Sequence, residues 1–462
     1  MGIAEFCRIS LELLNEVAFL EERDPMQQLT ATWTRRGWIT STSTAIATLT
    51  ATGWLKRIAN ATEQSQRPIR SCLLLWMNGG PSQTDTFDLK PGHENGGPFH
   101  PIQTSAPGVV VSEHLPKVAQ WMHRLSIIRS MSTREGDHGR ARDHLRTGYL
   151  PQAAIEFPVL GSLVSHEWGP QADDLPNYVS ILPRGLFRPG SPPSGFLGSQ
   201  DSPLLVGGGA ATTNTPLRVE NLAAPGEVTA DQFRERMALL KSLESQFLDA
   251  RPGQAADSYR DAYSRSVRLM SPTAAKAFEL EQESVAVRQR YGSSSFGQGC
   301  LLARRLLERR VPFVEVTLGG WDTHNDNFNA VKELSTTLDQ GWSSLLADLD
   351  ERGLLDSTLV VWMGEFGRTP TINPQQGRDH YPKAWSVVLG GGGIRGGSII
   401  GSTTPDGMEV ADRPVSTPDL LATICLALGI DPKKQNMSNV DRPIRIVDPV
   451  AQPISKLVAS PT

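Results

Sequence analysis

Cysteine is scarce in this chain of 462 residues, and its apolar runs are short. The four cysteines (Cys7, Cys72, Cys300 and Cys425) form no CxxC pair, which argues against a zinc-binding or disulfide framework. Cys72 and Cys425 lie in apolar runs and are expected to be buried thiols. No segment is long and apolar enough for a permanent membrane span. The net charge of −4 and the pI near 6.2 give no sign of a nucleic-acid-binding protein.

The remaining composition is that of a folded protein. Hydrophobic residues make up 39% and charged residues 20% of the chain, which is enough to form an ordinary core. The length suits one large α/β domain or two of medium size. The 42 glycines and 33 prolines predict long ordered loops between the regular elements.

Residues 1–66 read as an N-terminal extension with an export signal. The segment TRRGWITSTSTAIATLTATGWLK carries the twin arginine Arg35–Arg36, a hydroxyl-rich and mildly apolar run, and then Lys56. This order is typical of a twin-arginine signal and predicts a periplasmic or extracellular protein. About thirty residues precede the arginines, so Met26 is a candidate for the true start. The alternative is an amphipathic helix without a targeting role.

From residue 67 the pattern alternates between strands and helices. Apolar runs predict strands at 71–77, 125–130, 178–182, 312–318, 357–364 and 385–392. Helical patterns occupy 114–124, 138–150, 229–250, 255–270, 271–284, 296–310, 329–351 and 417–429. We therefore predict an α/β domain at 67–445, with a doubly wound, mostly parallel sheet and helices on both faces. A helical and loop insertion is expected at about 183–290, and a C-terminal tail at 446–462.

Polar residues crowd the loops that follow four of these strands. The loops are MNGGPSQTDTFD, STREGDHGRARDH, GGWDTHND and GEFGRTP, and the last is followed closely by GRDHYP. In a parallel sheet the carboxyl ends of strands meet at one edge, where functional groups gather. Carboxylates and imidazoles together suit a divalent cation. The set therefore favours a metal or anion site at this edge.

Each loop also has a structural explanation. Asp322 can cap the helix that follows, a role worth about 1 kcal/mol. Ser82 and Asp85 are ordinary turn residues. Arg142 can pair with Asp137 or Asp143 on a solvated surface. His138 and His144 are six residues apart and do not share a helical face, so they are not an obvious pair of ligands.

The motif order resembles that of a known family. WMNGGPSQTDTFD, DHGRARDHLRTGY, GGWDTHND, VVWMGEFGRTP and GRDHYPKAWSVVLGGGGIRGG resemble domain-of-unknown-function family 1501, a secreted, sulfatase-like family, over about residues 68–430. That family in turn resembles a branch of the alkaline phosphatase superfamily, which includes sulfatases, phosphatases and phosphomutases. The resemblance implies a doubly wound α/β sheet with divalent metals at its carboxyl edge.

The resemblance also implies roles for particular residues. It places Arg142 on the arginine of the sulfatase motif and His138 on the nucleophile, so both are expected to be catalytic. The implied metal ligands are Asp322, His324, Glu365 and His380, with Asn78, Asp85, Asp326 and Asp379 as further candidates. The metal is expected to be zinc, calcium, manganese or magnesium.

The chain departs from the superfamily pattern at three positions. Asn78–Gly79 stand where the first metal-binding aspartate is expected, and Phe366 replaces a histidine ligand. His138 stands in place of a serine, threonine or cysteine nucleophile. One retained metal site is therefore expected instead of two.

Three functions compete on this basis. The first is an exported, metal-dependent hydrolase of a small phosphate or sulfate ester, or of a sulfated or phosphorylated glycan. The second is a catalytically degenerate protein that binds an anionic glycan or another envelope component. The third is a structural secreted protein in which the clustered acids are a coincidence.

Overall fold

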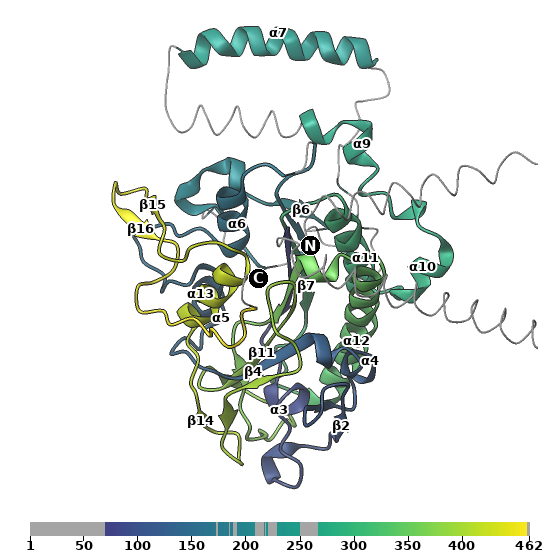
Figure 1. The fold of residues 1–462 in the computed structure, drawn as a ribbon, viewed down its shortest axis with the longest axis vertical. Coiled ribbons are helices and arrows are strands. Elements are labelled where there is room, and N and C mark those ends of the chain that lie inside the picture. Colours follow the sequence, from purple (N-terminus) through teal and green to yellow (C-terminus); the bar gives the residue numbers. More distant parts are fainter. Residues whose placement is uncertain are drawn as a thin grey trace, which may run out of the picture. The chain divides into compact units, whose positions relative to one another are not determined.

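A central sheet of eight strands organises the protein (Figure 1). The computed structural model describes residues 70–171, 174–183, 185–187, 192–207, 217, 219, 229–249 and 267–459. Neighbouring strands across the sheet are, in order, β12 (Ile399–Ile400), β4 (Leu125–Met131), β11 (Trp385–Gly391), β8 (Thr358–Met363), β1 (Ser71–Asn78), β7 (Phe313–Gly319), β5 (Tyr178–Ile181) and β6 (Leu204–Val206).

The sheet is mostly parallel, as the sequence predicts. β1 pairs in parallel with both β7 and β8, and β5 pairs in parallel with β7 and β6. β11 alone is reversed, because it pairs antiparallel with both β8 and β4. Two successive reversals leave β4 pointing the same way as β8. The carboxyl ends of β1, β4, β7 and β8 therefore lie at one edge of the sheet.

Helices cover both faces of the sheet, which confirms the predicted fold class (Figure 1). One face carries α4 (Pro116–Ala119), α11 (Ser295–Glu308) and α12 (Asn327–Glu351). The other face carries α5 (His138–Thr147), α6 (Leu160–Trp168) and α13 (Thr417–Ala427).

Strand β1 shows why its sequence is apolar throughout. Leu73, Leu75 and Met77 belong to the core beneath α11 and α12. Cys72, Leu74 and Trp76 belong to the core beneath α5, α6 and α13. Successive side chains of a strand point to opposite faces, so a strand buried on both faces needs an unbroken apolar run.

The other described elements are short, with one exception. The small sheets pair β2 (Pro101–Gln103) with β3 (Val110–Ser112), β9 (Gly367–Arg368) with β10 (His380–Tyr381), β13 (Ser402–Thr403) with β14 (Val410–Asp412), and β15 (Gln435–Met437) with β16 (Pro443–Arg445). The further α-helices are α3 (Gln83–Thr86), α7 (Ala230–Asp249), α9 (Pro272–Ala275) and α10 (Val285–Arg290). The 3-10 turns are η1 (Glu94–Gly96), η2 (Met122–Arg124), η3 (Gly195–Leu197), η4 (Ser199–Asp201), η5 (Leu280–Gln282) and η6 (Leu355–Ser357).

Two predicted helices are shorter than expected. The segment 114–124 forms only α4 and η2, because i→i+3 bonds such as Trp121 N to Val118 O tighten the chain before it enters β4. The segment 271–284 forms α9 and η5 with a turn between them. Most of the helix predicted at 255–270, and the whole N-terminal extension with Arg35–Arg36, lie outside the described residues.

Residues after 445 contribute to the main core. Ile446, Val447, Ile454 and Leu457 are buried among the side chains of α13 and the sheet. Val458 forms an isolated bridge with Ile394.

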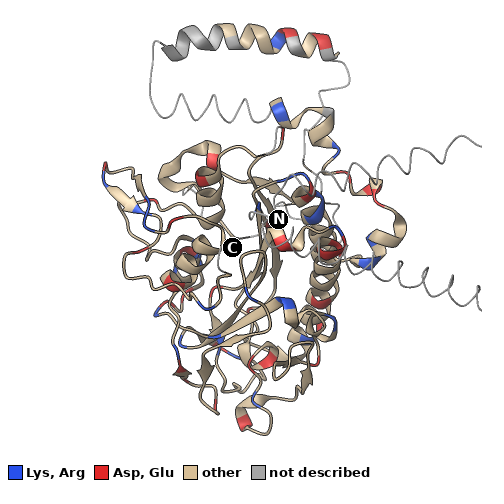
Figure 2. Cartoon of the chain, in the orientation of Figure 1, with Lys and Arg blue, Asp and Glu red and all other residues tan. Residues whose placement is uncertain are grey.

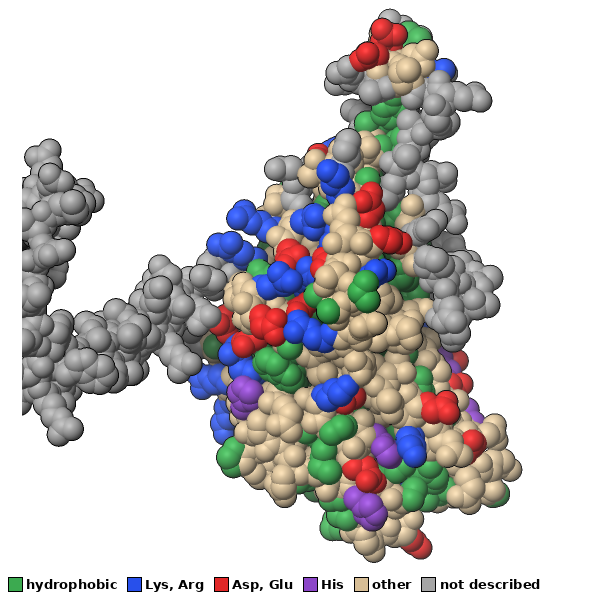
Figure 3. Space-filling view, turned by 90° about the vertical axis from the view of Figure 1, so that its right-hand side faces the viewer, with side chains coloured by type: hydrophobic (Ala, Val, Ile, Leu, Met, Phe, Trp, Pro, Cys, Tyr) green, Lys and Arg blue, Asp and Glu red, His purple; other side chains and the backbone are tan. Residues whose placement is uncertain are grey.

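The described surface mixes both signs of charge (Figure 2). On the face turned toward the viewer in Figure 3, basic and acidic side chains lie side by side. Ion pairs near the end of α12 illustrate this, with Arg290 of α10 to Glu351 at 3.1 Å and Arg352 to Glu308 of α11 at 3.0 Å. No helix in the described part of the chain is long and apolar enough to cross a membrane.

Candidate metal centre

Five chain segments meet at the carboxyl edge of the sheet. Four of them follow β1, β4, β7 and β8, whose carboxyl ends lie together. The fifth is the segment of β10, which precedes β11. Because β11 is reversed, its amino end lies at this same edge, and His380 comes close to the residues that follow the parallel strands.

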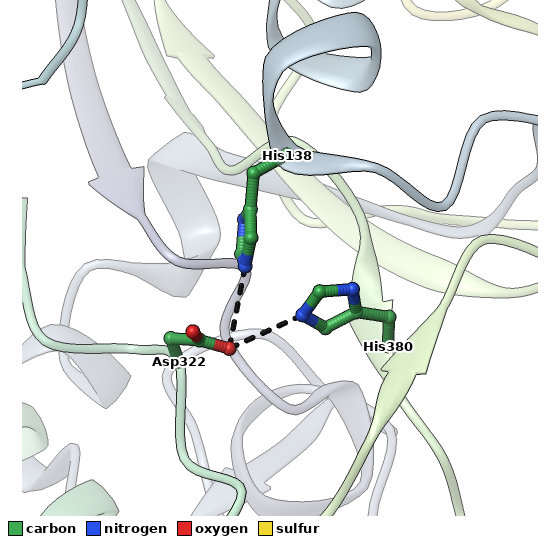
Figure 4. A group of neighbouring side chains, drawn as sticks. All are labelled: His138, Asp322 and His380. Carbon is green, nitrogen blue, oxygen red and sulfur yellow. Dashed lines mark hydrogen bonds and ion pairs between the residues drawn. The ribbon is translucent and has the colours of Figure 1, made fainter.

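The carboxylate of Asp322 lies between the imidazoles of His138 and His380 at this edge (Figure 4), and a third imidazole, that of His324, lies beside the same oxygen. Oδ1 of Asp322 lies 3.3 Å from Nε2 of His138, 3.1 Å from Nε2 of His324 and 3.3 Å from Nε2 of His380. His138 is the first residue of α5, and Asp322 and His324 lie between β7 and α12. The four side chains are between 28% and 47% exposed, so the cluster is open to solvent.

The far nitrogen of each ring has an acceptor of its own. Nδ1 of His138 lies 2.7 Å from Oε1 of Glu365, and Nδ1 of His324 lies 2.8 Å from Oδ1 of Asp379. Nδ1 of His380 lies 2.9 Å from the carbonyl oxygen of Gly136. Both nitrogens of each ring face an oxygen that only accepts, but the Nδ1 contacts are shorter than the contacts of 3.1–3.3 Å between Nε2 and Asp322. We therefore place the proton of each neutral ring on Nδ1.

This assignment leaves the lone pair of each ring on Nε2, the nitrogen that lies near Asp322. Nε2 of His324 and Nε2 of His380 are 3.1 Å apart, and neither has a proton to give when both rings are neutral. Nε2 of His138 is buried and has no hydrogen-bond partner among the described residues. Converging lone pairs with committed Nδ1 atoms are the usual arrangement of histidines that bind a metal. The donor atoms of His138, His380 and Asp322 lie within 4.8 Å of one another and fit a single cation, and Nε2 of His324 lies beside them.

Arg368 supplies a fixed positive charge beside this cluster. Its buried guanidinium donates to Asp322 Oδ1 at 2.5 Å, to Gly80 O at 3.0 Å and to the carbonyl oxygen of Gly79. Glu365 is also buried and accepts from Gly79 N at 2.9 Å through the oxygen that faces His138. Arg368 and Glu365 are thus both hydrogen-bonded to the backbone of the turn that follows β1.

These contacts shift the pKa values at the site. Burial raises the pKa of Asp322, but the hydrogen bond and charge of Arg368 lower it more strongly, to about 2. The hydrogen bond to Glu365 raises the pKa of His138, against the opposing effect of burial. Burial lowers the pKa of His380, which favours the neutral ring. The hydrogen bond from His324 lowers the pKa of Asp379.

The backbone around His324 is tightly constrained. A Cβ at Gly377 would lie only 1.8 Å from the carbonyl oxygen of His324, so no other residue fits there. Asn373 Nδ2 donates to that same carbonyl at 2.9 Å. Asp326 adopts a left-handed conformation with φ of 46°, which is uncommon outside glycine and fixes the entry to α12. The loop is therefore held from both sides.

The interpretation of Asp322 as a helix cap is wrong. α12 begins at Asn327, and its N-cap is Asp326, whose side chain makes no capping hydrogen bond. Asp322 instead faces the imidazoles and Arg368. The carboxylates of this loop are thus not explained by the helix that follows it.

Two of the predicted ligands contact the histidines of the cluster on their far side, away from Asp322. Glu365 and Asp379 each bond to the Nδ1 atom of a histidine. His138, which the sequence assigns to catalysis, lies among the candidate ligands instead.

Other predicted residues have different surroundings. Asp85 is fully buried and receives Arg378 Nε at 2.7 Å and Nη2 at 3.0 Å, so it belongs to a structural ion pair. Oδ1 of Asn78 accepts from Trp76 Nε1 at 3.4 Å. Oδ1 of Asp326 accepts from Asn329 at 2.8 Å. Arg142 lies one turn after His138 on α5 and donates to the carbonyl oxygen of Gly185.

The sequence alone indicates no role for two groups of the site, the guanidinium of Arg368 and the carbonyl oxygen of Gly136. Arg368 appears in the motif GEFGRTP, but nothing in that motif indicates that the guanidinium reaches Asp322. The carbonyl oxygen of Gly136 leaves no side-chain signal at all. Phe366, which replaces a histidine in the superfamily pattern, packs its ring against His138 and His380, with centroids 4.9 Å and 4.7 Å away.

The fold and this site define an α/β protein with a histidine-rich cluster at the carboxyl edge of its sheet. The family model described as "Protein of unknown function (DUF1501)" matches residues 69–458. The chain belongs to this family, which confirms the resemblance seen in its motifs. No curated protein matches it in sequence.

Solved structures similar to the chain include sulfatases and members of the alkaline phosphatase superfamily. The PsFucS1 sulfatase from Pseudoalteromonas sp. is 13% identical over 81% of this chain and 70% of its own, with a TM-score of 0.40. An alkaline phosphatase superfamily protein from Vibrio parahaemolyticus is 11% identical over 80% and 69%, with a TM-score of 0.39. The phosphonate monoester hydrolase SpPMH from Silicibacter pomeroyi is 11% identical over 78% and 73%, with a TM-score of 0.35.

Proposed function

We propose that this protein is an exported, metal-dependent hydrolase of phosphate or sulfate esters. The observation that carries the proposal is the convergence of three Nε2 atoms on Asp322 while every matching Nδ1 atom is bonded elsewhere. In this proposal His138, His324, His380 and Asp322 hold one divalent cation. The ester class follows the motif resemblance described above.

The donor atoms favour some cations over others. Imidazole nitrogen suits zinc, copper, iron and nickel, whereas calcium, magnesium and manganese prefer oxygen ligands. A set of three imidazoles and one carboxylate therefore narrows the four cations named from sequence. Of these four cations, zinc fits the set best.

The bound cation would polarise an ester oxygen and lower the pKa of a coordinated water molecule. The chain's own contribution begins with Arg368, whose buried charge offsets that of Asp322. The charge of the cation is then not neutralised by its own carboxylate ligand, and the site attracts an anionic ester. Glu365 and Asp379 accept from Nδ1 of His138 and His324, which fixes the orientation of both rings and leaves the lone pair of each neutral ring on Nε2.

Exposure of the cluster supports binding of an external substrate. The four side chains retain 28% to 47% of their exposure, in contrast to the full burial of Arg368. A small anionic ester, or the anionic group of a sulfated or phosphorylated glycan, is the expected substrate. Arg142, one helical turn beyond His138, is the candidate for holding that group.

One observation favours a second function. Four protein donors complete a tetrahedral coordination shell, and such closed sites are usually structural, whereas catalytic sites keep a position open. In that alternative the protein is a degenerate member that binds an anionic glycan or envelope component. It would bind sulfated glycans while every ester assay remained blank.

Elemental analysis of purified protein tests the proposal directly. We expect one equivalent of divalent metal in the wild type and none in Asp322→Ala. Asp326→Ala is a matched control, since it removes a neighbouring carboxylate from the same loop and should keep the metal. A panel of phosphate mono- and diesters, phosphonate esters and sulfate esters then tests turnover. Metal content that is unaffected by Asp322→Ala would refute the site.

A further inference from the structure

A buried carboxylate lies in the middle of strand β7, far from the metal cluster. Glu315 is fully buried between β1 and β5, where its register partners are Leu74 and Ser180. Its Oε2 accepts from Arg146 Nη2 at 2.8 Å and from the Tyr178 hydroxyl at 2.5 Å. A charge at such a position needs a compensating partner, since burying it alone is very costly.

The partner, Arg146, comes from helix α5 on one face of the sheet. Its Nη2 lies 3.1 Å from the second oxygen of Glu315 and 2.9 Å from the Tyr178 hydroxyl. The guanidinium also lies over the rings of Phe187, at 4.7 Å, and Trp76, at 5.8 Å. It is thus held by hydrogen bonds within the sheet and by aromatic rings around it.

This ion pair joins two of the elements that position the metal cluster, α5 and β7. α5 begins at His138, and Arg146 follows eight residues later, about 12 Å along the helix at 1.5 Å per residue. β7 carries Glu315 and ends at Gly319, shortly before Asp322. Sliding or rotating α5 on the sheet would move His138 relative to Asp322 and would break the bonds of Arg146 to Glu315 and Tyr178.

We propose that Arg146, Glu315 and Tyr178 are positioning residues that set the register of α5 on β7, and thereby place His138 against Asp322. The part of this proposal that concerns metal binding rests on the proposed function. The part that concerns the position of His138 does not.

A purely stabilising role explains the pair less well. Replacing a buried ion pair by apolar residues of similar size is often neutral or stabilising. Such pairs are retained in some proteins because they specify one arrangement among several similar ones. Apolar helix faces alone specify the axial position of a helix weakly, whereas a hydrogen-bonded ion pair accepts one position only.

The test removes the ion pair and the Tyr178 hydroxyl together, so that no buried charge remains, and keeps Ser180, whose hydroxyl donates to Glu315 Oε2 at 3.4 Å. In the triple variant R146M/E315L/Y178F, each polar group loses its partners at the same time, so the fold should survive with an unchanged or higher melting temperature. We expect its zinc affinity to fall at least tenfold. We also expect the visible absorption bands of the cobalt-substituted protein to change, since these report coordination geometry.

A second readout needs no metal. In the metal-free wild type, the proton on Nδ1 of His138 should give a downfield nuclear magnetic resonance signal through its bond to Glu365. We expect this signal to be lost or shifted in the triple variant.

The control removes an ion pair on the other face, between the buried Arg305 and the partly buried Glu283, which also pairs with Arg304. Arg305 bonds to Glu283 there, and R305M/E283L should leave the zinc affinity and the His138 signal unchanged. If the triple variant does not fold, Tyr178→Phe alone removes one bond to Glu315 and should shift both readouts in the same direction.

The outcomes separate the two proposals. A folded triple variant, or Tyr178→Phe, with wild-type zinc affinity and an unshifted His138 signal would overturn the positioning role. Wild-type protein that binds no metal would overturn the proposed function. The His138 signal would still decide the positioning role in that case.

Discussion

Replacing Glu365 should weaken metal binding without unfolding the protein. Its Oε1 accepts from His138 Nδ1 at 2.7 Å and from Gly79 N at 2.9 Å, while its Oε2 is buried without a hydrogen-bond partner among the described residues. Glu365→Gln keeps the shape and one accepting oxygen but removes the negative charge. Glu365→Leu removes the acceptor altogether, so that His138 can move its proton to Nε2.

The expected magnitudes follow from the hydrogen bond that changes. A bond to a charged group contributes about 1.5–3 kcal/mol and a neutral bond about 0.5–1.5 kcal/mol, so Glu365→Gln should cost about 1 to 1.5 kcal/mol of metal binding. That corresponds to about a tenfold weaker affinity. Loss of a partner behind a metal-bound histidine typically costs 10- to 100-fold, and Glu365→Leu should approach the upper end.

A competition titration against a chromophoric chelator measures these affinities for zinc. Asp379→Asn is the internal comparison, because Asp379 serves His324 in the same way but is 55% exposed, and water can replace it. We expect a loss of only a few-fold there. Equal affinities in wild type and both Glu365 variants would refute the assignment of Nε2 as the metal-binding atom of His138.

Three further predictions concern residues outside the cluster. Asp85→Asn leaves the buried Arg378 without its counter-charge, so the free energy of unfolding should fall by about 3–5 kcal/mol in chemical denaturation, with zinc affinity unchanged in the folded protein. Asp326→Gly relieves a left-handed residue, so the free energy of unfolding should stay within about 1 kcal/mol and zinc affinity should not change. The bond to Asp201 raises the pKa of His166 above 6.5, so its contribution is complete below that pH and is lost as pH rises through the folded-state pKa. The melting-temperature advantage of wild type over His166→Gln should therefore shrink as the pH rises above 6.5, and a constant difference would contradict the ion pair.

Local patterns in the sequence were sufficient to predict the central sheet and the edge at which the polar loops meet. The unbroken apolar run of β1 could be read as a strand buried on both faces because burial demands that composition. The loops after β4, β7 and β8 could be placed at one edge because parallel strands share it. These inferences need only periodicity and chain direction.

Roles within the site could not be read in this way. His138 and Glu365 are 227 residues apart, and their bond depends on how α5 lies on the sheet. Asp85 and Asp322 have similar surroundings in sequence, yet one pairs with Arg378 in the interior and the other faces imidazoles. Carboxylates of a loop cannot be sorted into ligands and structural ion pairs before the distant cations are placed.

The reversed strand β11 shows how much the site depends on an exception to the parallel rule. A parallel connection from β8 would have carried the chain back to the amino edge through a crossover of a dozen or more residues. Instead the chain stays at the carboxyl edge, where β9 and β10 pair Arg368 opposite His380 before β11 enters the sheet. Glu365, Arg368, Asp379 and His380 thereby remain in one excursion. That excursion supplies a candidate ligand, the fixed cation and two of the three groups that set the histidine tautomers. Because β11 is reversed, one loop supplies all four of these groups. In an all-parallel sheet they would have to come from two separate loops.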